Sequence, residues 1–180
     1  MEKCKKGEQK SLRLLYDSYA PLAMGVAMRY TGCEEKAKDV LHDSFVKILL
    51  SIERFEYRGS GSLKAWICRL VANTALSSLR KNMDFSTQKN EELEHIGEEQ
   101  EEELSVYESA NSHEIIKSVG RLPVRLRAVF NLYMFEDQSH AEIAQSLQIS
   151  EATSRVRLHR AKEQVAADLK EKFKEVSNER

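Results

Sequence analysis

The stretch "SHAEIAQSLQISEATSRVRLHRAK", residues 139–162, decides the fold of this chain. Its first part has the apolar spacing of a short helix, and its second part is a helix rich in arginine. Ala144 is small where two helices would cross, Ile149 fills the turn between them, and Ser150 can cap the second helix. Gln148 stands where such turns often have glycine, so we expect it to adopt that conformation at some cost. The spacing predicts a helix-turn-helix, which typically places its second helix in the major groove of DNA.

The second helix of this motif divides into an inward face and a cationic surface. Ser154, Leu158 and Ala161 share one face and are expected to pack inward. The basic side chains on the remaining surface are Arg155, Arg157, His159, Arg160 and Lys162. In a major groove, such side chains reach guanine edges and phosphates. The alternative is a solvated cationic helix without a ligand, so the motif needs support from the rest of the chain.

The net charge of −1 over 180 residues conceals a strong partition. Residues 1–83 hold 15 Lys and Arg against 9 Asp and Glu, and residues 115–180 hold 12 against 9. Residues 84–114 hold one lysine against 11 acids. The pattern indicates two basic modules and an acidic connector with few apolar residues, which predicts a flexible linker. We expect the carboxylates of this linker to mask the basic modules in the free protein.

Helical periodicity continues upstream of the acidic segment. Two helical runs are predicted to meet near Pro21, and further helices are predicted over 34–52 and 63–81. The stretch "FEYRGSGS", residues 55–62, breaks this pattern and predicts a loop. The predicted core includes Val40, Leu41, Phe45, Ile48, Leu49, Ile52, Trp66, Val129, Phe130, Leu132 and Tyr133. No strand-like alternation or internal repeat accompanies these helices, so the chain is predicted to be all-α.

Several classes of function are excluded by missing motifs. The three cysteines form no CxxC pair, and no histidine lies at zinc-ligand spacing, so we expect a reduced cytoplasmic compartment and no structural metal. No nucleophile arrangement, phosphate loop or dinucleotide glycine motif is present, so neither an enzyme nor a cofactor is predicted. The charged start lacks the apolar run of a signal peptide, and "PLAMGVAM" is too short to span a membrane. We therefore expect no membrane insertion.

Three stretches together resemble one protein family. "KAKDVLHDSFVKIL" is similar to the core-binding helix of bacterial sigma factors, and "FEYRGSGSLKAWICRLVANTALSSLRK" to the promoter-melting segment that follows it. "LPVRLRAVFNLYMFEDQSHAEIAQSLQISEATSRVRLHRAK" resembles the fourth sigma region. The chain is identified as a member of the extracytoplasmic function (ECF) sigma factors, which keep only regions two and four. The resemblance implies a region two domain over 1–83, an acidic linker over 84–113 and a region four helix-turn-helix domain over 114–180.

The resemblance also implies a role for individual residues. Binding of core polymerase, through the clamp helices of its largest subunit, is implied for Asp39, His42, Asp43 and Phe45. Contact with the minus-ten element, including a flipped base, is implied for Arg58, Gly59, Ser60, Gly61, Ser62, Lys64, Asn73, Arg80 and Lys81. Contact with the minus-thirty-five element is implied for Ser150, Thr153, Arg155, Val156, Arg157, His159, Arg160 and Lys162. Glycines let the loop backbone approach a base, and the cations add attraction for phosphate.

The implied partners are core RNA polymerase and promoter DNA, and the family makes an anti-sigma protein a further candidate. A helix-turn-helix regulator without a polymerase role is the alternative, although it leaves residues 34–83 unexplained. A helical adaptor is a third hypothesis, which explains the apolar stripes but not the glycine loop with its flanking cations. Run-off transcription with purified core polymerase separates the three hypotheses.

Overall fold

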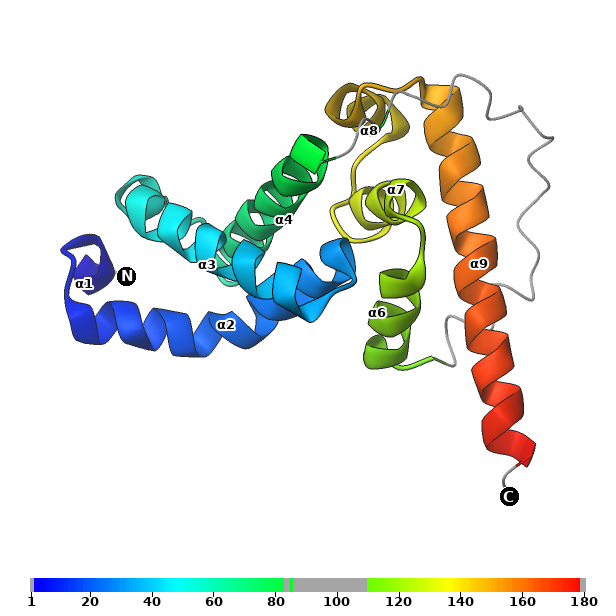
Figure 1. The fold of residues 1–180 in the computed structure, drawn as a ribbon. Helices are drawn as coiled ribbons and strands as arrows, with labels where there is room; N and C mark the ends of the chain where they lie inside the picture. Colours follow the sequence, from blue (N-terminus) through cyan, green and yellow to red (C-terminus); the bar gives the residue numbers. More distant parts are fainter. Residues whose placement is uncertain (1, 83–84, 86–109, 179–180) are drawn as a thin grey trace. The chain divides into compact units, whose positions relative to one another are not determined.

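The computed structural model describes residues 2–82, 85 and 110–178, and it divides into two compact units, Met1–Asn82 and Met83–Arg180. Every regular element among these described residues is a helix, which confirms the predicted all-α class (Figure 1). Most of the predicted acidic linker lies outside the described residues. The two units are described separately below.

The first unit is a bundle of three long helices with a short helix at its start. Its elements are α1 (Glu2–Lys5), α2 (Gln9–Thr31), α3 (Glu34–Ser51), the 3-10 turn η1 (Ile52–Arg54) and α4 (Ser62–Asn82). The helices α2, α3 and α4 pack against one another pairwise. Small and β-branched residues fill the centre of the bundle, where Ala27, Ile48 and Val71 are fully buried. This close packing fixes the outer faces of α3 and α4.

Three details of the first unit differ from expectation. The two helical runs predicted to meet near Pro21 form one helix, since α2 continues through this proline. Pro21 removes one backbone hydrogen bond, and packing of α2 against α3 and α4 compensates for that loss. Leu49 was predicted in the core but is 43% exposed. The predicted loop is shorter than 55–62, because α4 already begins at Ser62.

The second unit arranges three short helices along a long one. Its elements are α6 (Ser112–Arg121), α7 (Val124–Met134), α8 (His140–Leu147) and α9 (Glu151–Asn178). All three short helices contact α9, whose buried stripe includes Ser154, Leu158 and Ala161 as predicted (Figure 1). Tyr133 was predicted in the core but is 37% exposed. Its ring stacks on His140 and lies 5.9 Å from the Nζ atom of Lys162.

Local sequence signals account for the boundaries of the helix-turn-helix. Ser139 accepts a hydrogen bond from the backbone N–H of Glu142, whose carboxylate accepts one from the Ser139 N–H, so α8 starts with a capping box. Gln148 adopts φ 57°, ψ 46°, which confirms the left-handed conformation expected at that position. Ser150 accepts a hydrogen bond from the Thr153 N–H at 3.0 Å and caps α9 as predicted.

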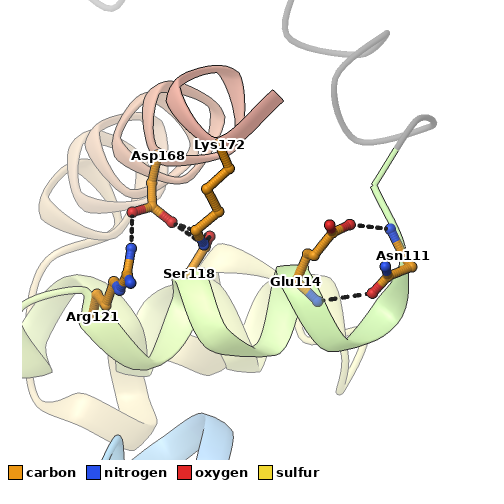
Figure 2. A network of polar contacts seen from close by, with 6 residues as sticks. All are labelled: Asn111, Glu114, Ser118, Arg121, Asp168 and Lys172. Atoms are coloured by element: carbon orange, nitrogen blue, oxygen red, sulfur yellow. Dashed lines mark hydrogen bonds and ion pairs between the residues drawn. The ribbon is translucent and has the colours of Figure 1, made fainter. Parts of the chain in front are cut away.

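A polar network joins α6 to α9. Asp168 accepts hydrogen bonds from Lys172 (2.7 Å), Arg121 (2.5 Å) and the hydroxyl of Ser118 (Figure 2). Burial by itself would raise the pKa of Asp168, but these three donors outweigh it and lower the pKa from 3.8 to about 2. The folded second unit therefore favours the ionised carboxylate.

Asp168→Asn is expected to destabilise the protein by about 1–2 kcal/mol at neutral pH, after allowance for solvent screening of a partly exposed pair. Because the folded pKa is depressed, this contribution is present above pH 3.8 and is lost as the pH falls toward 2. Urea unfolding at pH 7 and at pH 2.5 measures it: the variant and the wild type should differ at pH 7 and converge at the lower pH. Glu171→Gln, at an exposed position on the same helix, is the control.

Candidate nucleic-acid interface

The first surface is an acidic face on α3. Asp39, His42 and Asp43 are spaced three and four residues apart, so they lie on one side of the helix, and all three are exposed. The buried stripe of α3, formed by Val40, Ile48 and others, points away from them. The structure thus brings together three of the four residues implied in core binding.

The same side of α3 continues into exposed apolar residues. Val46 and Leu50 follow Asp43 at helical spacing and are 44% and 80% exposed, with Leu49 beside them. Phe45 does not belong to this face: it is 6% exposed, and its ring lies 4.6 Å from that of Tyr16. Its implied role as a direct polymerase contact is therefore corrected to one in packing. Sequence reasoning missed the apolar extension because it assigned Leu49 to the core.

The second surface starts at the glycine loop before α4. Gly59 and Gly61 adopt φ 109° and 85°, a region that side chains with a Cβ rarely occupy. Ser62 ties the loop together, since its hydroxyl donates to the Gly59 carbonyl at 2.8 Å and accepts from the Arg58 N–H at 3.2 Å. Ser60 is exposed at the tip of the loop. The loop is therefore held in shape with its backbone accessible.

Beside this loop lies a cavity of about 530 Å³, a size typical of small-molecule pockets. Its lining residues are Arg54, Phe55, Glu56, Arg58, Ser62, Ala65, Trp66 and Arg69. Trp66, predicted as a core residue, is instead half-buried and forms part of the wall, with its ring 5.1 Å from that of Phe55. Three arginines and one indole in a cavity suit a planar base on a charged backbone.

The exposed side of α4 extends this surface. Arg69, Asn73 and Arg80 repeat at four and seven residues, so they follow one face of the helix from the cavity toward its end, and Lys81 is exposed beside them. Lys64 precedes Asn73 by nine residues, which puts it about 180° away around α4. Lys64 therefore does not join this face, although it was assigned to the minus-ten contacts. Arg54 and Arg69 were missed because only the fold brings them to the cavity.

The third surface is the start of α9. Arg155, His159 and Lys162 line one side of the helix at spacings of four and three residues. Arg155 pairs with Glu151 at 3.1 Å, and His159 lies 3.5 Å from Glu163. Each of these cations thus has an exposed carboxylate partner, which solvent screens and a phosphate can replace.

Two residues assigned to the minus-thirty-five contacts are not on the surface. Val156 is 4% exposed and Arg157 is 1% exposed, whereas Arg160 is half-buried. Arg157 donates a hydrogen bond to the backbone carbonyl of Phe85 at 3.3 Å. In this conformation neither Val156 nor Arg157 can touch DNA, which corrects their direct assignment.

Two family models match the chain. The Sigma-70 region 2 model matches residues 15–84, and the Sigma-70 region 4 model matches residues 112–165. Together they cover more than half of the chain and include all three surfaces. The chain belongs to the sigma-70 family.

Relatives of this sigma factor define its class. It is 26% identical over 174 residues to the ECF RNA polymerase sigma-E factor of Haemophilus influenzae, which covers 92% of this chain and 90% of that protein. It is 28% identical over 136 residues to the RNA polymerase sigma factor SigV of Bacillus subtilis, with coverage of 76% and 77%. A solved structure of the sigma factor RpoE in complex with the anti-sigma factor NepR, from Bartonella quintana, covers 89% of this chain and 98% of its own at 18% identity, with a TM-score of 0.48. The protein is an RNA polymerase sigma factor of the ECF class.

Two further searches of the described residues returned nothing. No described helix of this sigma factor is both long and apolar enough to cross a bilayer. Among the same residues, no three His, Cys, Asp or Glu side chains are grouped so that they could hold a metal ion.

Proposed function

We propose that this ECF sigma factor uses its three surfaces for three steps of initiation. The acidic face of α3 binds the clamp helices in the largest subunit of core polymerase. The glycine loop and α4 hold the minus-ten element and a base flipped out of it. The start of α9 recognises the minus-thirty-five element, with residues 1–83 and 114–180 acting as the two domains.

The cavity beside the glycine loop carries this proposal. A base that leaves the duplex needs a planar apolar partner and neutralisation of its backbone charge. Trp66 supplies the indole face, and Arg58 and Arg69 supply the charge at the cavity edge. The left-handed Gly59 and Gly61 keep the approach free of side chains. A regulator that binds only duplex DNA has no use for such a cavity.

The apolar residues that follow Asp43 support the assignment of α3 to the polymerase. Val46 and Leu50 would be costly to leave in water, whereas a partner helix can cover them while pairing basic groups with Asp39 and Asp43. Because the polymerase supplies the chemistry, the sigma factor itself performs no catalytic step and acts in the cytoplasm. We propose an anti-sigma protein as a further partner, as is usual for the class.

Run-off transcription tests the proposal as a whole. Purified sigma factor and core polymerase should give defined transcripts from promoter fragments, and thymines near the start site should become reactive to permanganate. A protein that binds the same fragments but gives no transcript with core polymerase would be a regulator without a polymerase role. Transcripts that start equally well without the sigma factor would also contradict the proposal.

Arg160→Ala is expected to relax sequence preference at one or two minus-thirty-five positions, because a bidentate arginine–guanine contact is worth about 1–3 kcal/mol of discrimination. Competition of holoenzyme between the promoter and single-base variants measures this preference. Lys162→Ala, which removes a phosphate contact, is the matched control and should weaken all sequences alike. Unchanged selectivity of the Arg160→Ala holoenzyme would remove this residue from base recognition.

A further inference from the structure

One residue from the start of the segment between the domains is held against the recognition helix. Phe85 belongs to the second unit and is only 3% exposed. Its carbonyl accepts the hydrogen bond from Arg157, although the two residues are 72 positions apart in the chain. The contact is buried on both sides, since Arg157 is 1% exposed.

The burial of Val156 shows which side of α9 is covered. Ser154 and Leu158 lie on the inward stripe that α6, α7 and α8 cover. Val156 is two residues from each of them, so at 3.6 residues per turn it lies about 160–200° away, on the outward side. An apolar residue there would be exposed on a bare helix, yet Val156 is 4% exposed. The outward side of α9 is therefore covered by protein, and Phe85 is bonded at its edge.

We propose that Phe85 is an intramolecular plug that covers the DNA-recognition side of α9 in the free sigma factor. The proposal rests on the recognition role given to α9 above, and it adds a regulatory contact to that surface. The plug occupies Arg157 and covers the side that also carries Val156 and Arg160. Promoter DNA and Phe85 then compete for the same side of the helix.

The chemistry of the contact makes the plug reversible. In the closed state, Arg157 is bonded to a neutral carbonyl, whereas a DNA phosphate offers it a charged acceptor and a stronger hydrogen bond. The closed state lowers the apparent affinity for DNA by the fraction of molecules that are open. Attachment of the first unit to core polymerase can then favour the open state by drawing residues 83–85 away from α9.

Phe85→Ser is expected to tighten binding of a minus-thirty-five duplex by the free full-length protein about tenfold. Fluorescence anisotropy with a labelled duplex measures this affinity. Phe85→Leu keeps an apolar plug and should stay within about twofold of the wild type. Leu14→Ser removes a side chain that is 68% exposed on α2 and is the control for a general loss of apolar surface.

A salt series separates this plug from masking by the acidic segment. Phe85 is uncharged, so its removal should shift the plot of log affinity against log salt without changing the slope. Masking by Glu98, Glu99, Glu101, Glu102 and Glu103, which lie outside the described residues, would instead fade as salt rises. A gain for Phe85→Ser that disappears at high salt would overturn the plug as the cause.

The closed state is observed without DNA by placing a tryptophan at the plug. In Phe85→Trp combined with Trp66→Phe, the single indole should emit at short wavelength and resist iodide quenching, and duplex should reverse both properties. A solvent-like emission in the free protein overturns the proposal, as does equal DNA affinity of Phe85→Ser and the wild type. Failure of the proposed function appears elsewhere, as a wild-type holoenzyme that does not initiate, a result that Phe85 does not influence.

Discussion

Exchanging Asp39 and Asp43 together for arginine is expected to lower the affinity of the sigma factor for core polymerase about 100-fold or more, which corresponds to at least about 2.7 kcal/mol. Both carboxylates are exposed on one face of α3, so each can pair with a basic group of a partner. Reversal replaces attraction with repulsion, and it leaves the partner's cations buried without a counter-charge. Pull-down and run-off transcription should both show the loss.

The folded state should tolerate this change, because exposed substitutions usually alter stability by no more than about 0.5 kcal/mol. Asp17→Arg with Glu53→Arg makes the same change of net charge at exposed positions away from the α3 face and is the control. If the control pair lowers core binding as much as the α3 pair, net charge rather than this face determines the affinity. Full binding by the α3 pair, with a normal helical spectrum, would remove the face from the polymerase interface.

Trp66→Ala is expected to reduce promoter opening about 10–100-fold while leaving the initial binding of duplex promoter largely intact. Stacking of a base on an aromatic side chain is worth about 1–3 kcal/mol, and Trp66 is the indole in the wall of the α4 cavity. The effect falls on opening because a base reaches the cavity only after leaving the duplex. Permanganate reactivity of unpaired thymines measures opening, and a gel-shift assay with closed promoter measures binding.

The ring contact between Trp66 and Phe55 requires a control for stability. Trp66→Phe keeps an aromatic face and should recover a large part of the opening, whereas Trp66→Leu keeps apolar volume without a π-face and should not. Equal recovery by both would mean that Trp66 only supports the loop. Thermal unfolding of all three variants shows whether the first unit is intact.

Local chemistry explains the parts of the fold that were predicted correctly. The cap at Ser150 and the left-handed Gln148 depend on residues within a few positions, so short-range sequence patterns are sufficient for them. Helix α6 shows the same kind of signal, because Asn111 and Glu114 form a capping box in Figure 2, although this helix was not predicted. The apolar stripe of α9 was also predicted correctly, because helical period sets it directly.

Errors arose where a side chain lies at the edge of a stripe or meets a distant segment. Periodicity assigned Leu49 and Trp66 to the core, but it does not set how wide a stripe the neighbouring helices cover. The position of Lys64 opposite Asn73 follows from the register of α4, which is known only once α4 is seen to be unbroken. Phe45 is buried because Tyr16 of another helix lies over it.

The sequence by itself determined the helical class, the helix-turn-helix, its caps and the family, since each depends on residue type at short spacing. Only the tertiary structure decided which side chains remain accessible. The cavity joins residues from η1, the glycine loop and α4, and the contact of Phe85 with Arg157 spans 72 positions. Such contacts depend on how helices pack after loops close, and the identity of either residue alone does not specify its distant partner.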